Sequence, residues 1–267
     1  MKDGKAIQAG TSHYLGQNFA KGFEIKFLDR DNQLKYVFTT SWGVSTRLIG
    51  ALIMAHGDDR GLVMPPQVAP TQVIMIPIGP AKTREKVMPK FDALYGQLKA
   101  AGIRVKSDLR DETPGWKFNE WEMRGVPIRL ELGPRDVDNN QCVIARRDTG
   151  EKSPVSLDQI EETVKNLLNE IQSNLYQKAL AFRDANSHLS IETLADLEKH
   201  ISDAEANNQL AGWVLGGWCG DDACEAKVKE TTKFTARNIP LNPPVHKTTC
   251  MCCGQQAKHT VWYSRAY

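Results

Sequence analysis

The stretch Ser41–Gly61, SWGVSTRLIGALIMAHGDDRG, separates two kinds of sequence in this chain. It begins as a polar turn broken by glycine and continues as an apolar segment whose hydrophobic residues recur at helical intervals. Arg47 stands at the junction, where a buried helix would not place a guanidinium. Gly61 and Pro65-Pro66 then end the regular structure. The stretch predicts a turn followed by a helix that carries Arg47 at its start.

Composition places the chain among ordinary globular proteins. Of its 267 residues, 41% are hydrophobic and 25% are charged, and this length fits one large domain or two to three small ones. The net charge of +2 is compatible with nucleic-acid binding but does not indicate it, so any basic surface must be local. No apolar run reaches the roughly 18 residues of a membrane span. The start, MKDGKAIQAG, lacks the apolar region of a secretory signal. We therefore expect a cytoplasmic protein that does not associate with membranes.

Residues 1–66 show β-prone sequence that leads into one helix. The runs Phe23–Leu28 and Leu34–Thr39 are separated by the turn-forming residues Asp29–Asn32. Leu48, Leu52 and Ala55 then recur at helical spacing.

From Thr71 onward, strand and helix patterns alternate. The alternation predicts a mixed α/β domain of ordinary size, about 100 residues. The expected strands are TQVIMIPIG, IRVKSD, VPIRLELG and QCVIARRD, and the expected helices are Thr83–Ala101 and WKFNEWEMRG.

Two further helices and a compositionally distinct tail follow. Ser156 and Asp158 favour the start of a long helix that runs to about Arg183. The stretch SIETLADLEKHISDAEANNQ contains an [ST]-x-x-[DE] opening and predicts a second helix. The tail is rich in glycine, cysteine, proline and aromatic residues.

The cysteines are distributed unevenly, and their clustering predicts a metal site. Five of the six fall after residue 218, as CGDDAC and CMCCGQQ, while Cys142 stands alone. Zinc prefers four tetrahedral ligands, and thiolates supply both charge and softness. Two cysteine groups joined by a loop can close such a shell and stabilise a small domain that has few apolar residues. The sequence therefore predicts structural zinc.

The ligand set has one open choice. The preferred ligands are Cys219, Cys224, Cys250 and Cys253, because the last two form C-x-x-C-G. Cys252 is the alternative to Cys253. His246 and His259 are candidate substitute ligands.

At this point the motifs resemble those of a known family. The chain resembles prolyl-tRNA synthetase of the eukaryotic and archaeal type, a class II aminoacyl-tRNA synthetase, over essentially its whole length. The matching stretches are AIQAGTSHYLGQNFAK, TSWGVSTRLIGALIMAHGDDRGLVMPPQVAP, PGWKFNEWEMRGVPIRLELGPRD, RRDTGEK, the cysteine cluster and the final SRAY.

The resemblance implies an α/β and α+β architecture in three parts. Residues 1–66 would be the C-terminal part of the antiparallel-sheet catalytic domain, including the third signature motif of the class. Residues 67–172 would form an α/β anticodon-binding domain. Residues 173–267 would form a small zinc-binding α+β domain.

The resemblance also implies roles for the first part of the chain. Arg47 would clamp the terminal phosphate of ATP, which enters with Mg²⁺, and Gln8, Thr11 and Ser45 would lie at the nucleotide. A helix N-terminus and a guanidinium suit that role, because both attract phosphate.

His13, Ser41 and Trp42 would shape the proline pocket. Without the resemblance, Arg47 is equally readable as a solvent-facing or salt-bridged residue, Trp42 as core packing and His13 as a structural histidine.

The middle part would read the anticodon of tRNA(Pro). The candidates are Arg129, Glu131, Arg135, Arg146 and Arg147, with Lys152 nearby. A carboxylate such as Glu131 suits the N1–H and N2–H₂ donors of guanine.

The alternation of Ile128, Leu130 and Leu132 places Arg129 and Glu131 on one face, so these two are also readable as an ion-pair network. Trp116, Lys117 and Trp121 precede them, and we expect the tryptophans to pack rather than to stack on bases.

The first two class II motifs are absent from the chain. We therefore expect it to be inactive by itself, its N-terminal catalytic segment lying on another polypeptide or being lost by truncation. Residues 1–66 would then be incompletely packed. The whole enzyme would be a homodimeric proline–tRNA ligase. The alternative is a non-catalytic tRNA-binding or regulatory protein derived from the synthetase. Tyr267 would return toward the catalytic pocket, unless it is an ordinary frayed terminus.

Overall fold

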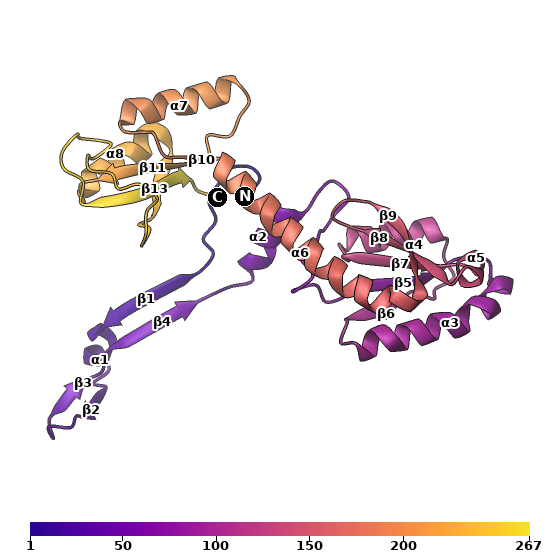
Figure 1. The fold of residues 1–267 in the computed structure, drawn as a ribbon. Helices are drawn as coiled ribbons and strands as arrows, with labels where there is room; N and C mark the ends of the chain where they lie inside the picture. Colours follow the sequence, from indigo (N-terminus) through magenta and orange to yellow (C-terminus); the bar gives the residue numbers. More distant parts are fainter. The chain divides into compact units, whose positions relative to one another are not determined.

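The computed structural model describes residues 1–267, the side chain at position 81 excepted. The chain forms two compact units, one made of Leu52–Ala185 and the other of Met1–Ala51 together with Asn186–Tyr267 (Figure 1). Among the described residues, no helix has both the length and the apolar character needed to span a bilayer.

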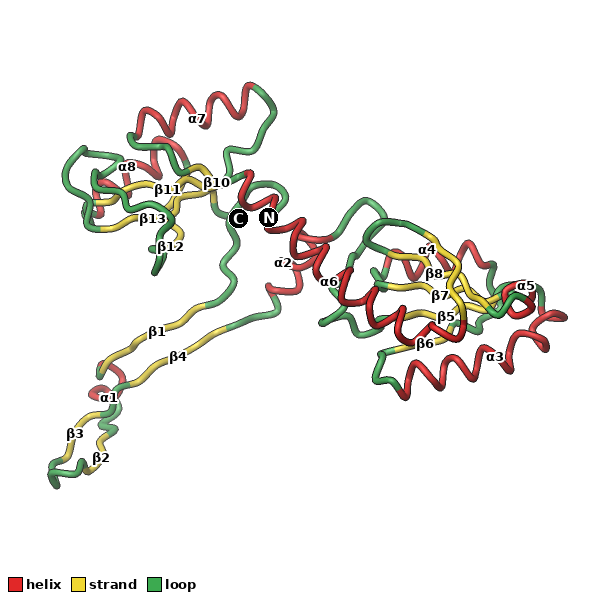
Figure 2. The backbone as a smooth tube through the Cα atoms, viewed as in Figure 1, coloured by secondary structure: helices red, strands yellow, loops and turns green.

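The unit Leu52–Ala185 is built on a five-stranded sheet with the order β6-β5-β7-β8-β9, whose strands are labelled in Figure 1 and drawn in yellow in Figure 2. Strand β5 runs parallel to β6 and β7, and β8 is antiparallel to both β7 and β9. The strands are β5 (Val73–Pro77), β6 (Val105–Ser107), β7 (Ile128–Leu132), β8 (Gln141–Arg146) and β9 (Lys152–Ser156). The four strands expected from the sequence are confirmed, and β9 was not anticipated.

Helices of this unit cover both faces of the sheet. They are α3 (Ala81–Ala100), α4 (Pro114–Met123), α5 (Pro134–Asp138) and α6 (Ile160–Ala185), which is preceded by the 3-10 turn η1 (Leu157–Gln159). Every residue of β5 is buried, and the strand reads as a continuous apolar run because it has helices on both sides.

The two faces of the sheet carry separate apolar cores. The larger core joins β5 and β7 to α3 and α6 through residues such as Phe91, Leu130 and Val164. The smaller core places Ile74 and Ile76 of β5 against Trp121 of α4 and Val126. Helix α4 therefore packs on the face of the sheet opposite to the one that α3 and α6 cover.

The long helix expected after Ser156 is confirmed. The Ser156 side chain accepts a hydrogen bond from the Asp158 backbone N–H at 3.4 Å, and α6 then continues to Ala185. Its residues Val164, Leu168, Ile171 and Leu175 are buried, as a helix with one apolar stripe requires.

The second unit contains a four-stranded sheet with the order β10-β11-β13-β12. Its elements are β10 (Ser187–His188), α7 (Leu194–Ala206), β11 (Trp213–Trp218), α8 (Asp222–Thr232), β12 (Phe234–Asn238) and β13 (His259–Arg265). Thr193 caps α7 through a reciprocal capping box with Asp196, which confirms the opening expected from the sequence.

Residues 11–56 contribute two short ribbons and two helices. Strand β1 (Thr11–Gly16) pairs with β4 (Thr39–Gly43), and β2 (Lys26–Leu28) pairs with β3 (Leu34–Tyr36), both antiparallel. The helices are α1 (Asn18–Gly22) and α2 (Arg47–His56), so Arg47 opens its helix as expected.

Most large apolar side chains on these ribbons are exposed, although the rings of Tyr14 and Phe38 stack on each other. Tyr14 is 74% exposed, Phe23 71% and Trp42 82%, and α2 has no buried residue among those described. Large side chains of this kind are normally covered, which agrees with the expectation that this part of the chain is incompletely packed.

The end of the chain is held by backbone hydrogen bonds to its beginning. Ala6 N–H donates to the Arg265 carbonyl at 2.8 Å, and Tyr267 N–H donates to the Ala6 carbonyl at 3.0 Å. Ala6 and Ala266 form a parallel bridge. The C-terminal residues are therefore bound to the backbone of Ala6, two residues before Gln8 in the sequence, and do not form a frayed terminus.

The segment 58–64 is built onto the end of α4. Leu62 N–H donates to the Met123 carbonyl at 2.9 Å, and Met64 N–H donates to the Gly125 carbonyl at 3.0 Å. This contact explains why the compact unit begins before residue 67 and, because α6 ends at Ala185, extends beyond residue 172.

Gly125 is required at this contact. Its φ is +71°, and an added Cβ would lie 2.5 Å from the Leu62 carbonyl group. We expect Gly125→Ala to lower the free energy of unfolding of this unit by more than about 2 kcal/mol, through backbone strain and steric overlap. Native-state hydrogen exchange of the β5 amides measures the unfolding of this unit by itself.

The matched control is Gly96→Ala in α3, where an added Cβ meets no atom within 4 Å. We expect this change to raise the free energy of unfolding by about 0.5–1 kcal/mol, because alanine is the better helix former. Equal protection in the two variants would contradict the close approach of Leu62 to Gly125.

Candidate nucleic-acid interface and metal centre

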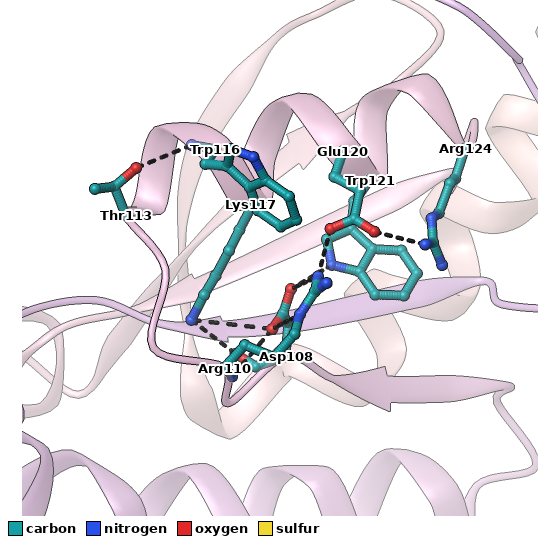
Figure 3. A network of polar contacts seen from close by, with 8 residues as sticks. All are labelled: Asp108, Arg110, Thr113, Trp116, Lys117, Glu120, Trp121 and Arg124. Atoms are coloured by element: carbon teal, nitrogen blue, oxygen red, sulfur yellow. Dashed lines mark hydrogen bonds and ion pairs between the residues drawn. The ribbon is translucent and has the colours of Figure 1, made fainter.

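Asp108 follows β6 directly and fastens α4 to the sheet (Figure 3). Its carboxylate is buried and accepts hydrogen bonds from Trp121 Nε1 at 2.7 Å, Arg110 Nε at 3.0 Å and Arg110 Nη2 at 2.6 Å. The hydrogen bonds from Arg110, reinforced by Trp121 and opposed by burial, lower the pKa of Asp108 to about 2. The side chain is therefore a buried carboxylate at neutral pH.

Lys117 completes the buried part of this network. Its ammonium donates to the Asp108 carbonyl at 3.3 Å and lies 4.0 Å from the Asp108 carboxylate. Burial lowers the pKa of Lys117. Trp121 is buried as well, so both side chains hold α4 in place and neither is available to a nucleic acid.

The outer part of the network is exposed. Glu120 accepts hydrogen bonds from Arg110 and Arg124 (Figure 3). The Arg110 guanidinium lies 4.9 Å from the centre of the Trp116 ring, and Trp116 is 47% exposed. The expectation of packing is met by Trp121 and only partly by Trp116.

A cavity of about 120 Å³ lies between α4 and strands β7 and β8. Residues of both signs line it, and basic side chains predominate. The lining includes Arg60, Glu122, Arg129, Arg146, Arg147 and Lys152.

Phe118 of α4 is partly buried against the smaller core and lies next to two residues of the cavity lining. The Arg129 guanidinium lies 4.0 Å from the centre of the ring and the Lys152 ammonium 5.0 Å from it. Glu131 accepts from Arg129 Nε at 2.9 Å and from Lys152 Nζ at 3.0 Å, both on Oε1. One ring, two cations and one carboxylate can together stack a planar base and hydrogen-bond its edge.

The other predicted anticodon residues are placed differently. Arg146 is paired with Asp148 and Glu170. Arg147 makes two hydrogen bonds to the Asp58 carboxylate, at 2.8 and 2.5 Å, and its side chain is only 4% exposed. Both guanidiniums are occupied by carboxylates. Arg135 is exposed at the start of α5.

Phe118, Glu122 and Arg60 are not among the residues predicted from the sequence. Phe118 and Glu122 are four residues apart on α4, so they share a helical face, and that spacing was the available signal. Arg60 reaches the cavity through a tertiary contact that no local pattern encodes.

The candidate nucleotide residues are linked by hydrogen bonds. Arg47 Nη1 donates to Gln8 Oε1 at 3.4 Å, and Gln8 Nε2 donates to Thr11 Oγ1 at 2.7 Å. The Arg47 backbone N–H donates to Ser45 Oγ at 3.3 Å. The structure therefore brings together the four residues Gln8, Thr11, Ser45 and Arg47 at the start of α2.

The candidate proline-binding residues lie on the β1–β4 ribbon. His13 is opposite Ser41, and Ser12 is opposite Trp42. Because Trp42 is 82% exposed, it is not part of any core formed by this chain.

Four cysteines converge in the second unit. The Sγ atoms of Cys219, Cys224, Cys250 and Cys253 all lie within 4.8 Å of one another, and Cys252 does not belong to this group. The Sγ atoms of Cys219 and Cys253 are 3.9 Å apart. Zinc–sulfur bonds of about 2.3 Å would place two tetrahedral ligands about 3.8 Å apart, so these residues fit a zinc ion.

The pKa values of the clustered thiols are shifted in different directions. Burial opposes ionisation of Cys250, but backbone N–H groups of Cys253, Cys252 and Cys219 lower its pKa to about 7. Burial and the neighbouring thiols raise the pKa of Cys224. A bound cation would relieve the repulsion that several thiolates experience at this spacing.

Comparison with known proteins identifies both units. The anticodon binding domain family matches residues 72–167, and the family described as prolyl-tRNA synthetase, C-terminal, matches residues 203–267. The chain is 72% identical over all its 267 residues to a proline–tRNA ligase of Symbiobacterium thermophilum, of which it covers 55%. It is 50% identical to a proline–tRNA ligase of Ruminiclostridium cellulolyticum, of which it covers 54%.

An anticodon-binding domain followed by this C-terminal domain defines part of an aminoacyl-tRNA synthetase. The chain belongs to the prolyl-tRNA synthetase family and corresponds to the C-terminal portion of a synthetase. It spans about half the length of the curated relatives it matches. The family expected from the sequence is confirmed, and the eukaryotic and archaeal type stays a prediction.

The Asp108 carboxylate gives a pH-dependent prediction. We expect Asp108→Asn to lower the free energy of unfolding by about 3 kcal/mol at neutral pH, because it leaves a buried cationic network without its counter-charge. The folded-state pKa of about 2 lies below the ordinary value of 3.8. The stabilisation is therefore present above pH 3.8 and is lost as the pH falls toward 2.

The measurement is urea unfolding of wild type and variant at a series of pH values, followed by tryptophan fluorescence. The difference between them should shrink in acid. Asp111→Asn, whose side chain is 99% exposed, is the control and should match wild type throughout. A difference that stays constant down to pH 2 would contradict the assignment.

Proposed function

We propose that the chain is the C-terminal part of a proline–tRNA ligase, which activates proline with ATP to prolyl-adenylate and transfers it to tRNA(Pro). The observation that carries the proposal is the cavity between α4 and strands β7 and β8, whose lining residues other than Arg60 lie within the range that the anticodon binding domain family matches. A cationic hollow next to an aromatic side chain suits the recognition of unpaired RNA bases.

We assign anticodon reading to the side chains around this cavity. A base would enter next to the Arg129 guanidinium, which lies over the Phe118 ring, and Arg129 and Lys152 would hold its carbonyl and ring acceptors. Both cations bond to Oε1 of Glu131, so Oε2 is the atom that would receive the N1–H of a guanine. Arg146 and Arg147 would act mainly by holding the cavity wall, since their guanidiniums are already paired. Arg135 would meet the RNA from outside the cavity.

At the start of α2, we assign ATP binding to Gln8, Thr11, Ser45 and Arg47. The helix N-terminus attracts phosphate, and Arg47 would exchange its 3.4 Å hydrogen bond with Gln8 for a bidentate phosphate contact. Mg²⁺ would accompany the nucleotide. This arrangement positions reactants and stabilises charge, and it requires no covalent enzyme intermediate.

His13, Ser41 and Trp42 would form part of the proline pocket on the β1–β4 ribbon. The exposed face of Trp42 leaves room for a further layer of packing. We propose that the two remaining class II motifs belong to a preceding segment, which would cover this ribbon, and that the whole enzyme is a cytoplasmic homodimer.

We assign structural Zn²⁺ to Cys219, Cys224, Cys250 and Cys253. The bound ion would neutralise the thiolates and hold β11, α8 and the loop before β13 together. The remaining side chains of the unit supply its apolar core.

The activity is tested with the chain alone and mixed with the N-terminal half of the Symbiobacterium thermophilum relative. We expect ATP–pyrophosphate exchange and charging of tRNA(Pro) only in the mixture. Arg47→Gln should lower the exchange by about 10²-fold or more, because it removes a contact to the charge that develops on the phosphates. Arg30→Gln, an exposed arginine in the β2–β3 turn, is the control and should change nothing.

A mixture that binds tRNA(Pro) without exchange or charging would favour the alternative, a non-catalytic tRNA-binding or regulatory protein. Full exchange with Arg47→Gln would contradict the assignment of the nucleotide site.

For the metal, we expect about one zinc per chain after purification without chelator. Cys224→Ser should lose the ion and destabilise the second unit, whereas Cys252→Ser should retain both, because only the former removes one of four clustered sulfurs. Elemental analysis and thermal unfolding measure the two effects. Metal-free wild-type protein, or equal zinc loss in both variants, would refute the ligand set.

A further inference from the structure

We propose that Arg60 binds a phosphate of the anticodon loop beside the base that occupies the cavity. This inference rests on the proposed tRNA binding. Arg60 lies outside residues 72–167, the range that the anticodon binding domain family matches, and yet it lines the same cavity as Arg129 and Lys152.

The first argument is the availability of the guanidinium. Arg146 is tied to Asp148 and Glu170, and the Arg147 side chain is only 4% exposed. Arg129 is 13% exposed and occupied by Glu131. The Arg60 side chain is 69% exposed, which makes it the most accessible arginine of this cavity among the described residues.

The second argument is that the backbone of Arg60 is held in place. Asp58 is anchored by two hydrogen bonds from Arg147 and accepts the Arg60 backbone N–H at 2.9 Å. The hydrogen bonds from Arg147 lower the pKa of Asp58 to about 2, so this anchor is charged at neutral pH. Gly61, at φ +121°, lies against the backbone of Met123. The guanidinium is therefore presented at a defined position.

The third argument is donor capacity. Arg60 Nη1 donates to Glu122 Oε1 at 3.0 Å. A guanidinium carries five N–H donors, so this one contact leaves a face for phosphate oxygens. Arg60 and Glu122 also line a neighbouring cavity of about 510 Å³, together with Asn119, Met123 and the acidic residues Asp58, which is paired with Arg147, and Asp59. Arg60 and Glu122 therefore lie between the two cavities. An RNA strand that places a base in the cavity between α4 and β7 would pass its sugar–phosphate backbone next to them.

The test is binding of the full chain to a stem-loop RNA that carries guanines at the second and third anticodon positions, and to the same RNA with both guanines replaced. We expect Arg60→Gln to weaken binding of both RNAs about tenfold, because it removes one charged hydrogen-bonding contact. The dependence of log K on log salt should become shallower by about 0.7, the value of one single-strand phosphate. Arg60→Lys should keep most of that slope.

Arg183→Gln is the matched control, because its side chain is 67% exposed, it is paired with Asp184 and it lies on α6 outside the cavity lining. It should bind both RNAs like wild type. The thermal midpoints of Arg60→Gln and wild type should agree, which separates an RNA contact from a structural role.

Unchanged affinity and salt slope in Arg60→Gln would overturn the inference while leaving the proposed function standing. A loss confined to the guanine-containing RNA would overturn it too, because a phosphate contact carries no base preference. Failure of wild type to bind either RNA would overturn both this inference and the proposed function.

Discussion

The buried carboxylate of Asp108 is the interaction on which the nucleic-acid interface depends. It receives Trp121 and Arg110 and lies beside Lys117, and so it fastens α4 to the end of β6. Helix α4 in turn carries Phe118 and Glu122 toward the cavity, and its C-terminal end holds the segment that presents Arg60. Burying the Asp108 carboxylate without partners would cost a large amount of free energy. Its hydrogen bonds and the neighbouring cations remove that cost and hold the side chain in one position.

The cysteine-containing region and residues 11–56 differ in how their side chains are packed. In the second unit, Cys219, Cys224, Cys250 and Cys253 converge at a spacing that could hold a metal ion. Residues 11–56 instead expose large apolar side chains, Trp42 among them, and keep their polar candidates hydrogen-bonded to one another. The C-terminal backbone joins these regions through its hydrogen bonds to Ala6.

Local pattern predicted a good part of this arrangement. Alternation in β7 placed Arg129 and Glu131 on one face, where the structure pairs them, and the C-x-x-C spacing favoured Cys253 over Cys252. The pattern failed where contacts are long-range. Arg147 is one of the residues predicted to read the anticodon, and no local pattern indicates that Asp58, 89 residues earlier, pairs with its guanidinium. The two cations next to Phe118 come from β7 and β9, which are distant from α4 in the sequence. Helix α2 has an apolar pattern but is exposed, because no other element covers it among the described residues.

The central claim is that the cavity between α4 and β7 receives an anticodon base. Photo-crosslinking addresses it directly, with 6-thioguanine placed at the second or third anticodon position of tRNA(Pro) and the attached peptide mapped by mass spectrometry. The account predicts attachment within residues 114–132 or at Lys152. Attachment confined to the unit that contains the cysteine cluster, at comparable yield for both positions, would contradict it.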